Sequence, residues 1–360
     1  MAELDHGGNV QEIAAQLGAD WRTFIDFSAS INPLGPPREV LDLMRDCAAL
    51  LAAYPPNHNA ALLAALAEYC GLTPDHLVVG NGATDLIYFV FRFFAPREVL
   101  LTCPTFSEFR RACLNLGIGV DAMVLLRTDG RRWCVDWRAL DERLRARSPN
   151  LLVLVHPNNP TGATLALDEA LDVLELTRHR DITVLLDESF IDFIPDESWV
   201  SVLAVYEHLV IVRSLTKFFA IPGLRLGYLA ASPALTARMR QVREPWQVNQ
   251  LSQAAGQACV AAREYHERTR RLIADERARL AESLAAIPGF TPFPSRVNFL
   301  LVNVDPVVAR VSAIHERLLS HRILIRRCDT WSGLPDNCFR VAVRSRAENE
   351  QLIEGLRTCV

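Results

Sequence analysis

The sequence is almost without lysine. Of its 38 basic residues only Lys217 is a lysine, and all the others are arginine. Arginine supplies surface charge but stays protonated, whereas a lysine amine can lose its proton and form a Schiff base. A single remaining lysine is therefore a candidate for covalent chemistry. The alternative is compositional drift towards arginine that left one lysine by chance.

Several other features are also missing from the 360 residues. No apolar run approaches the roughly 18–20 residues that a membrane-spanning helix needs. The first residues show no basic region followed by an apolar one, so no secretory signal is indicated. The nine cysteines are scattered, with no CxxC and no Cys/His spacing typical of a metal site. We therefore expect reduced thiols, no metal centre and a cytoplasmic protein.

Charge and composition exclude further classes. The net charge of −4 gives no electrostatic attraction to nucleic acid or to an anionic membrane. Half of the residues are hydrophobic and 22% are charged, which is typical of a globular protein. The length suits about two domains.

Strand-like and helix-like segments alternate through the middle of the chain, for example strand 151–155 before helix 168–179. This alternation predicts an α/β fold with a mostly parallel central sheet flanked by helices. Polar clusters follow several of the strands, at the sheet edge where ligands bind in such folds. The other predicted strands of this region are 76–79, 99–102, 183–186 and 209–212.

Three regions are expected. Residues 1–35 have a loop-like composition and form an N-terminal arm, and residues 36–250 form the large domain. Residues 251–360 form a smaller α+β domain. We expect its elements to be a long amphipathic helix 263–287, a strand 298–303, a helix 307–321 and a strand 339–343.

The residues around the single lysine suggest a chemical role for this segment. It reads S-x-T-K-x₅-G-x-R-x-G from Ser214 to Gly227. Lys217 can form an imine with an aldehyde cofactor, while Ser214, Thr216 and Arg225 can hold a phosphate group. The pattern resembles the cofactor-lysine segment of fold-type-I pyridoxal-phosphate (PLP) enzymes in the class I/II aminotransferase superfamily.

Further motifs follow the chain order of that superfamily. Gly82, Ala83 and Thr84 come after a predicted strand and open a helix, so their backbone N–H groups can cradle a phosphate. The resemblance implies that Phe106 stacks on the pyridine ring. It also implies a small α+β C-terminal domain beside the PLP-binding domain.

The resemblance assigns the remaining cofactor contacts. Asn159, in an Asn-Pro-Thr-Gly turn, would bind O3′ of the cofactor, and Asp187 would pair with its pyridine nitrogen. Tyr54 matches a tyrosine that reaches the neighbouring subunit's cofactor, which implies a homodimer. Arg340 matches the arginine that binds the substrate carboxylate.

Two phosphate-handling groups of this superfamily fit in length and motif style, the histidinol-phosphate aminotransferases and the threonine-phosphate decarboxylases of cobalamin synthesis. The N-terminal HGGN at residues 6–9 and the DFSASINPLG at residues 26–35 resemble the decarboxylases. Phe190 stands where aminotransferases of this group usually have tyrosine. The resemblance implies a substrate site made of His6, Gly8, Asn9, Asn32, Asn159, Arg326 and Arg340.

The expected activity is PLP-dependent decarboxylation of L-threonine O-3-phosphate to (R)-1-aminopropan-2-yl phosphate, with Lys217 and Asp187 as catalytic residues. An aminotransferase, most plausibly for histidinol phosphate, is the alternative. A DNA-binding regulator with a PLP-binding domain is disfavoured, because the sequence shows no basic patch and only about 35 residues precede the PLP-domain pattern, too few for a helix-turn-helix domain. An inactive homologue is disfavoured by the intact Lys217, Asp187 and Arg225. The sequence does not distinguish threonine phosphate from serine phosphate, nor which of Arg326 and Arg340 binds the carboxylate.

Overall fold

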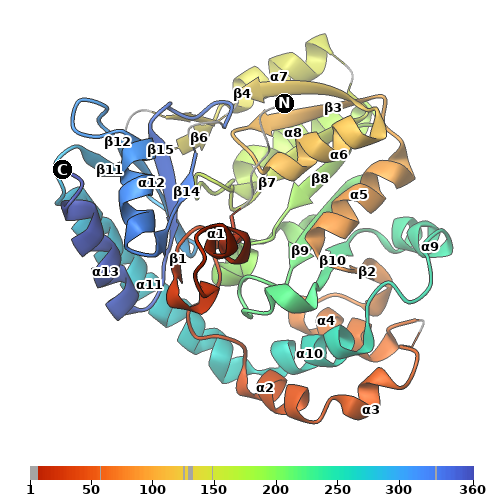
Figure 1. The fold of residues 1–360 in the computed structure, drawn as a ribbon. Helices are drawn as coiled ribbons and strands as arrows, with labels where there is room; N and C mark the ends of the chain where they lie inside the picture. The colour runs from red at the N-terminus through yellow and green to blue at the C-terminus, as the bar shows by residue number, and fades with distance from the viewer. Residues whose placement is uncertain (1–6, 57, 125, 129–132, 148, 329–330) are drawn as a thin grey trace.

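Two β-sheets of different size form the framework of the molecule (Figure 1). The computed structural model describes residues 7–56, 58–124, 126–128, 133–147, 149–328 and 331–360. Figure 1 shows the larger sheet on the right among its helices and the smaller sheet on the left, close to the C-terminal helix.

Seven strands of the described chain form the larger sheet, in the order β2-β10-β9-β8-β7-β3-β4. Only β10 runs antiparallel to its neighbours in this sheet, and the other pairs are parallel. The mostly parallel α/β sheet expected from the sequence is therefore confirmed. The strands are β2 (Leu77–Gly80), β3 (Glu98–Cys103), β4 (Gly119–Val124), β7 (Leu151–Val155), β8 (Thr183–Asp187), β9 (Leu209–Ser214) and β10 (Gly227–Ala230).

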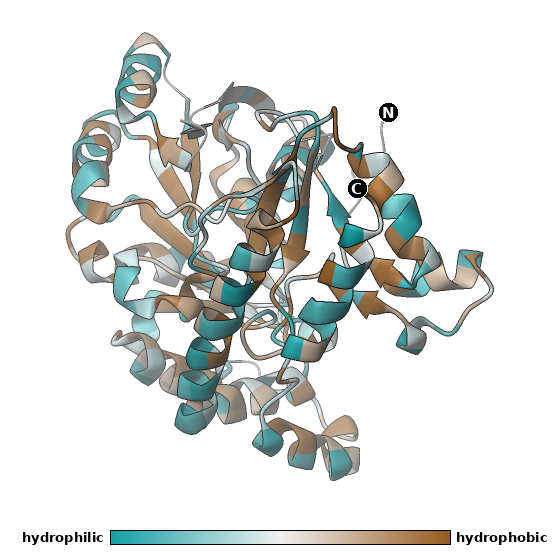
Figure 2. Ribbon diagram, turned by 90° about the vertical axis from the view of Figure 1, so that its left-hand side faces the viewer, coloured by the Kyte–Doolittle hydropathy of each residue, from teal (hydrophilic) through white to brown (hydrophobic). Residues whose placement is uncertain are grey.

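The central strands are apolar throughout because both of their faces are buried. In β7, Leu151, Val153 and Val155 face one hydrophobic core, while Leu152 and Leu154 face the other. This alternation follows from the two-residue period of a strand. Figure 2 shows these strands as hydrophobic segments in the interior, with the hydrophilic residues on the outer helices.

Helices cover both faces of this sheet. On one face lie α5 (Ala83–Phe94), α6 (Ser107–Leu116) and α9 (Pro233–Gln241). On the other lie α4 (Ala60–Cys70), α7 (Trp137–Ala146), α8 (Leu167–His179) and α10 (Gln250–Ala261). Helix α10 also packs against α2 (Arg38–Arg45) and α3 (Ala48–Leu51). A short hairpin, β5 (Leu126–Thr128) with β6 (Trp133–Val135), precedes α7.

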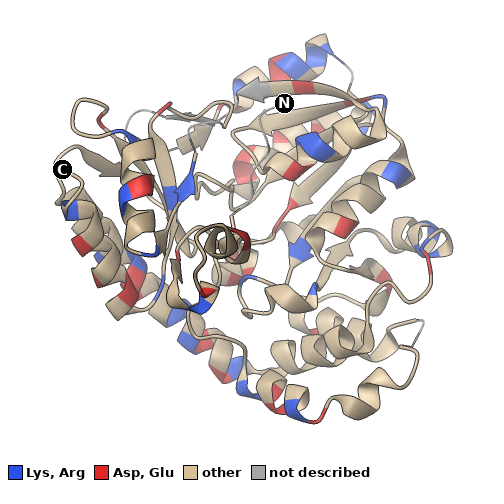
Figure 3. Cartoon of the chain, in the orientation of Figure 1, with Lys and Arg blue, Asp and Glu red and all other residues tan. Residues whose placement is uncertain are grey.

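The smaller sheet is antiparallel, in the order β11-β12-β15-β14 among the described residues. Its strands are β11 (Phe290–Pro292), β12 (Phe299–Val304), β14 (Arg326–Arg327) and β15 (Cys338–Ala342). The accompanying helices are α11 (Arg263–Ala285), α12 (Val311–Ser320) and α13 (Arg346–Arg357). Figure 3 shows acidic and basic residues interspersed along α11 and α13.

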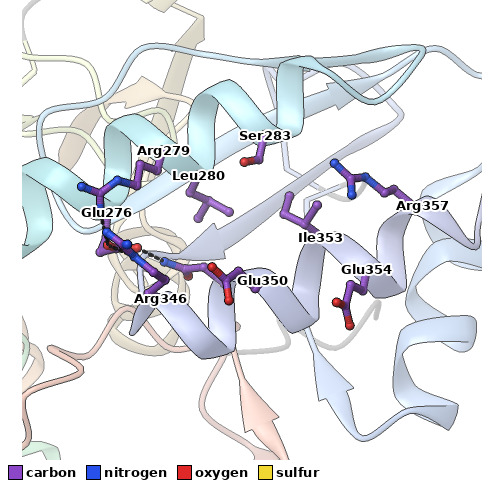
Figure 4. A pocket seen from close by; sticks show the side chains of 10 residues that line it. Glu276, Arg279, Leu280, Ser283, Arg346, Glu350, Ile353, Glu354 and Arg357 are labelled. Atoms are coloured by element: carbon purple, nitrogen blue, oxygen red, sulfur yellow. Dashed lines mark hydrogen bonds and ion pairs between the residues drawn. The ribbon is translucent and has the colours of Figure 1, made fainter.

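A buried carboxylate joins α11 to α13. Figure 4 shows Glu276 of α11 facing Arg346 of α13 in the groove between the two helices. Glu276 accepts hydrogen bonds from Arg279 at 2.8 Å, from Arg346 at 3.3 Å and from Asn349 at 3.3 Å. These bonds compensate the burial of the carboxylate charge and fix the C-terminal helix on the small domain.

The N-terminal arm is more ordered than its composition indicates. The expectation of a loop is wrong for α1 (Val10–Gln16), a seven-residue helix whose Ala14 is buried. Strand β1 (Ile25–Asp26) pairs in parallel with β13 (Ile323–Leu324), so the arm is joined to the small domain. Tertiary packing has overridden a weak local preference.

The observed bounds agree best with the predicted ones for strands that are buried on both faces. The start of helix α12 differs from the prediction, because the sequence predicts residue 307 and the helix begins at Val311. Asn337 explains the late start, because its Oδ1 accepts the Val311 N–H at 2.9 Å while residues 305–309 form a turn. The domain boundaries near residues 35 and 250 remain predictions. No helix in the described part of the chain is both long and apolar enough to span a membrane.

Candidate active site

A cavity of about 670 Å³ lies where the large sheet, the small sheet and the N-terminal arm meet. Its lining comes from distant parts of the chain: the arm, the turn before α5, the ends of β7, β8 and β9, and β15. The predicted residues that line it are Gly8, Ala83, Thr84, Phe106, Asn159, Asp187, Ser214, Thr216, Lys217, Arg225 and Arg340.

Lys217 projects into this cavity three residues beyond the end of β9. Its Nζ donates to Ser214 Oγ at 3.0 Å and lies 5.5 Å from the centre of the Phe190 ring. Burial lowers the pKa of Lys217 to about 8, Arg225 and Arg340 lower it too, and Asp187 opposes them. A large share of the amine is therefore neutral near pH 8, which is what an attack on an aldehyde requires.

Asp187 is the last residue of β8 and lines the cavity. Its Oδ1 accepts the Ser189 N–H at 2.8 Å. Burial raises the pKa of Asp187, while Ser189 and Lys217 favour its charged form. A carboxylate in this position is suited to hold a positively charged nitrogen in the cavity.

The turn before α5 has the features of an anion site. Gly82 has a φ of +87° and precedes the first helical residue, Ala83, so the helix N-terminus opens at this turn. A Cβ on Gly82 would lie 2.5 Å from Arg225 Nη2, so the close approach of this guanidinium needs glycine. The free N–H groups of a helix N-terminus and an adjacent cation both favour a phosphate.

Hydroxyl groups and a second glycine complete this corner. Ser214 and Thr216 share a hydrogen bond of 2.8 Å at the cavity wall. A Cβ on Gly227 would lie 2.9 Å from the Ala83 nitrogen, so glycine lets β10 pass directly against the turn. The S-x-T-K and G-x-R-x-G parts of the motif thus meet at one place.

Arg340 crosses from the small sheet to the opposite side of the cavity. It donates through Nη2 to Ser28 O at 3.0 Å and through Nη1 to Asn159 Oδ1. Its Nε is buried without a hydrogen-bond partner, and within the described residues no carboxylate lies at ion-pair distance from it. Burial and the nearby charge of Arg326 lower the pKa of Arg340 to about 10, so it stays charged at neutral pH. A buried, unpaired guanidinium is an energetically costly group that an anionic ligand would satisfy.

The N-terminal arm contributes a wall that sequence reasoning only partly identified. Gly7, Gly8, Ser28 and Ser30 all line the cavity, and Gly8 N–H donates to Ser28 Oγ at 3.0 Å. The hydroxyl of Ser30 is buried and has no hydrogen-bond partner in the described part of the chain. The alternation of Ser28, Ser30 and Asn32 along an extended segment would have been the signal for finding Ser28 and Ser30.

The assignment of Asn32 to the substrate site is wrong for this structure. Its side-chain amide is buried away from the cavity and donates to Phe218 O at 2.8 Å and to Thr269 Oγ1 at 2.8 Å. Its backbone N–H donates to Lys217 O at 3.1 Å. Asn32 therefore holds the backbone of the lysine segment instead of facing a ligand.

Other predicted residues are not brought to the cavity wall. Tyr54 is 81% exposed and packs against Trp246, with the ring centres 4.9 Å apart and the rings tilted by 33°. Arg326 lies opposite Arg340 on the neighbouring strand, with its guanidinium over the Trp331 ring. Asn9 follows the lining glycines as the residue before α1, and His6 lies outside the described residues.

The N-terminal half of α6 adds two charged residues that the sequence did not single out. Glu108 and Arg111 line the cavity beside Phe106 and form an ion pair of 3.1 Å. The only signal available was an opposite-charge pair spaced three residues apart on a helix, which is more often a surface feature.

His156, just after β7, is a structural residue of the turn that carries Asn159. Its Nδ1 accepts the Leu165 N–H at 2.9 Å, so its proton is on Nε2, which donates to Glu197 O at 3.0 Å. Burial lowers the pKa of His156 to about 4. The neutral imidazole therefore joins the turn to the loop at residue 197.

Comparison with known proteins agrees with this arrangement. The model of the aminotransferase class I and II family matches residues 22–356. The threonine-phosphate decarboxylase of Salmonella typhimurium is 37% identical, over 98% of this chain and 95% of that protein. The histidinol-phosphate aminotransferase of Roseiflexus castenholzii is 31% identical, over 97% of this chain and 93% of that protein.

A solved structure shares the fold. The histidinol-phosphate aminotransferase of Clostridium acetobutylicum superposes with a TM-score of 0.85 at 28% identity, covering 92% of this chain and 98% of that one. The chain belongs to the aminotransferase class I and II family and is an enzyme of that family.

The lowered pKa of Lys217 can be tested directly because the chain has no other lysine. In cofactor-free protein, acetylation of the Lys217 peptide should rise with a midpoint near pH 8 instead of the ordinary 10.5. Removing the cation in Arg340→Gln should raise the midpoint, and removing the anion in Asp187→Asn should lower it. Mass spectrometry after timed acetic anhydride pulses gives the rates, and a midpoint near 10.5 would contradict the buried environment.

The neutral state of His156 predicts a stability change with pH. Its folded pKa of about 4 lies below the ordinary 6.5, so the unfolded chain gains a proton first as the pH falls. Its contribution is therefore complete above pH 6.5 and declines towards pH 4. Between pH 7 and 5 the stability advantage of wild type over His156→Asn should shrink by about 2 kcal/mol in denaturant titrations. The exposed His179→Asn variant is the control, and a pH-independent difference would refute the assignment.

Proposed function

We propose that the enzyme decarboxylates L-threonine O-3-phosphate to (R)-1-aminopropan-2-yl phosphate, with PLP as its cofactor, in cobalamin synthesis. The observation that carries the proposal is the position of the N-terminal arm at the cavity wall. Gly7 and Gly8, from the segment that resembles the decarboxylases, line the same cavity as Lys217 and Arg340. The 37% identity to a threonine-phosphate decarboxylase supports it.

The residues present fit PLP. The helix N-terminus at Gly82, with its room for Arg225, suits the phosphate, and Asp187 suits the pyridine nitrogen. Lys217, with its pKa lowered to about 8, suits the aldehyde. Phe106 and Asn159 line the cavity where a ring face and O3′ would lie. When bound, PLP supplies an electron sink conjugated to the substrate Cα.

The substrate ends are recognised separately. Arg340, with its unpaired Nε, is the group in the cavity best placed for the carboxylate. Ser30 Oγ and the Gly7–Gly8 backbone lie in the arm wall and are suited to the substrate's phosphate. Arg326 lies opposite Arg340 on the neighbouring strand and outside the cavity lining, and its positive charge disfavours the charged form of Arg340.

Three residues carry the chemistry that this chain itself performs. Asp187 would pair with the cofactor nitrogen, whose positive charge would favour the carboxylate form, and would hold the proton on that nitrogen. Arg340 orients the carboxylate so that the bond from Cα can break, and binding it too strongly would oppose the loss of CO₂. Lys217 Nζ then delivers a proton to Cα, a step suited to an amine with a pKa of about 8.

The alternative is histidinol-phosphate aminotransfer, supported by relatives such as the 31% identical protein. Phe190 favours the decarboxylase. It lines the cavity and packs against Phe299 with ring centres 5.0 Å apart, and it offers no hydroxyl where these aminotransferases usually have tyrosine.

Product analysis decides between the two reactions. With O-phospho-L-threonine the holoenzyme should release CO₂ and one aminopropanol phosphate per CO₂, without amino transfer to 2-oxoglutarate. Transfer without CO₂ would establish the aminotransferase instead. O-phospho-L-serine in the same assay tests whether the enzyme discriminates by the substrate's methyl group, which contributes only about 1–3 kcal/mol of binding free energy in a pocket.

Arg340→Gln should lower kcat/KM for O-phospho-L-threonine about 100-fold, because charge-assisted hydrogen bonds to the carboxylate are lost. Arg327→Gln, an exposed arginine next to Arg326 on the same strand, is the matched control and should keep normal activity. Equal activity of both variants would remove Arg340 from the substrate site.

We further propose a cytoplasmic homodimer in which Tyr54 serves the neighbouring active site. Tyr54 lies outside its own chain's cavity, in an exposed aromatic pair with Trp246, which suits a contact with a second copy. The nine cysteines are free thiols, as a reducing compartment requires.

Subunit mixing tests this role. Lys217→Ala is expected to be inactive and Tyr54→Ala weakly active. Mixed dimers contain one site with both wild-type residues, so activity should rise after the two variants are unfolded and refolded together. Refolding each variant alone is the control, and no gain on mixing would contradict the shared site.

A further inference from the structure

An ion pair between the buried Arg243 and the partly buried Asp85 lies directly behind the turn that precedes α5. Asp85 belongs to the first turn of this helix, and its Oδ2 accepts the Asn81 N–H at 3.0 Å. The same oxygen accepts Arg243 Nη2 at 2.7 Å. One carboxylate therefore fixes the turn on one side and binds a guanidinium on the other.

Gly80 provides the room for this contact. A Cβ on Gly80 would lie 2.7 Å from Asp85 Oδ2. The turn itself is closed by the Gly82 N–H, which donates to Gly80 O at 2.8 Å. The bend that presents the N–H groups of Ala83 and Thr84 thus depends on the position of the Asp85 carboxylate.

Arg243 comes from a distant segment just after α9. Its side chain is only 5% exposed, and its guanidinium lies over the Phe89 ring at 4.4 Å. Nη2 also lies 3.5 Å from Val79 O, while Nε and Nη1 have no hydrogen-bond partner among the residues that the structure describes. The interactions of this buried cation are therefore directed at Asp85 and at the strand that leads into the turn.

Charge explains why the pair is needed. Asp85 places a negative charge within one helical turn of the N–H groups that suit a phosphate, and like charges at this distance repel each other. Arg243 neutralises that charge while the carboxylate keeps its hydrogen bond to Asn81. An aspartate can then shape an anion site without opposing the anion.

We propose that Arg243 is a positioning residue for the phosphate-binding turn. It acts through Asp85, by fixing its carboxylate and cancelling its charge, and it does not contact the phosphate. The inference rests on the proposed role of the turn at residues 80–84 as the anchor of the cofactor phosphate.

The test measures binding instead of turnover. In cofactor-free protein, Arg243→Gln should weaken PLP binding at least about ten-fold in absorbance titrations, because the partly buried Asp85 carboxylate is left without its cation. Arg243→Gln with Asp85→Asn removes both charges, and the amide oxygen can still accept the Asn81 N–H. This double variant should bind PLP within about three-fold of wild type. Arg243→Lys keeps the charge and should retain most of the affinity.

Arg240→Gln is the matched control. Arg240 also extends from α9 to the β2 edge, where it donates to Leu77 O at 2.7 Å, and its carboxylate partner among the described residues is Asp75, not Asp85. This variant should bind PLP as wild type does. Thermal stabilisation by inorganic phosphate, measured on the same proteins, gives a second readout that does not depend on the aldehyde.

The measurements distinguish the role of Arg243 from the proposal that PLP is the cofactor. Wild-type affinity in Arg243→Gln would overturn the role of Arg243, and a double variant as weak as the single one would overturn charge cancellation. If wild type bound phosphate but not PLP, the cofactor proposal would fail. The phosphate measurements on the variants would then still decide the role of Arg243.

Discussion

The molecule is organised around an amine and a carboxylate that share one buried cavity. Lys217 and Asp187 each carry a burial cost, which lowers the pKa of the amine and raises that of the carboxyl group, and each favours the charged form of the other. Such a pair is stable only where the backbone fixes both groups. Strands β8 and β9 do so. They are paired in parallel, with Asp187 beside Val212, so the side chains of Asp187 and Lys217 both lie at the carboxyl-end edge of the large sheet.

The same constraint explains the contribution of the small domain and the arm. A cavity that contains only the sheet edge would be open on one side. Arg340 on β15 and the arm around Ser28 close that side and are bonded to each other at 3.0 Å. Strand β1 pairs with β13, so the arm and the small sheet meet the cavity as one unit. Two guanidinium groups suited to anions, those of Arg225 and Arg340, thus line the same cavity as Lys217.

The sequence predicts those parts of the fold and the site that depend on interactions between residues close together in the chain. Strand β7 was predicted at its observed bounds because an apolar run buried on both faces is a local signal. The cofactor motif was readable because Ser214, Lys217 and Arg225 lie within twelve residues. Asn32 was misplaced because its partners, Phe218 and Thr269, are far away in sequence, and local pattern does not indicate which polar side chain meets them. The ion pair of Glu108 and Arg111 had no signal that separates a cavity wall from a surface helix.

The central claim is that Lys217 is the covalent anchor of the cofactor. Borohydride reduction of the PLP-loaded enzyme, followed by proteolysis and mass spectrometry, tests it most directly, because the chain contains one lysine. The account predicts a pyridoxyl group on the Lys217 peptide, with about one per chain. Absence of the label from that peptide, or its appearance only on the terminal amine, would contradict the account.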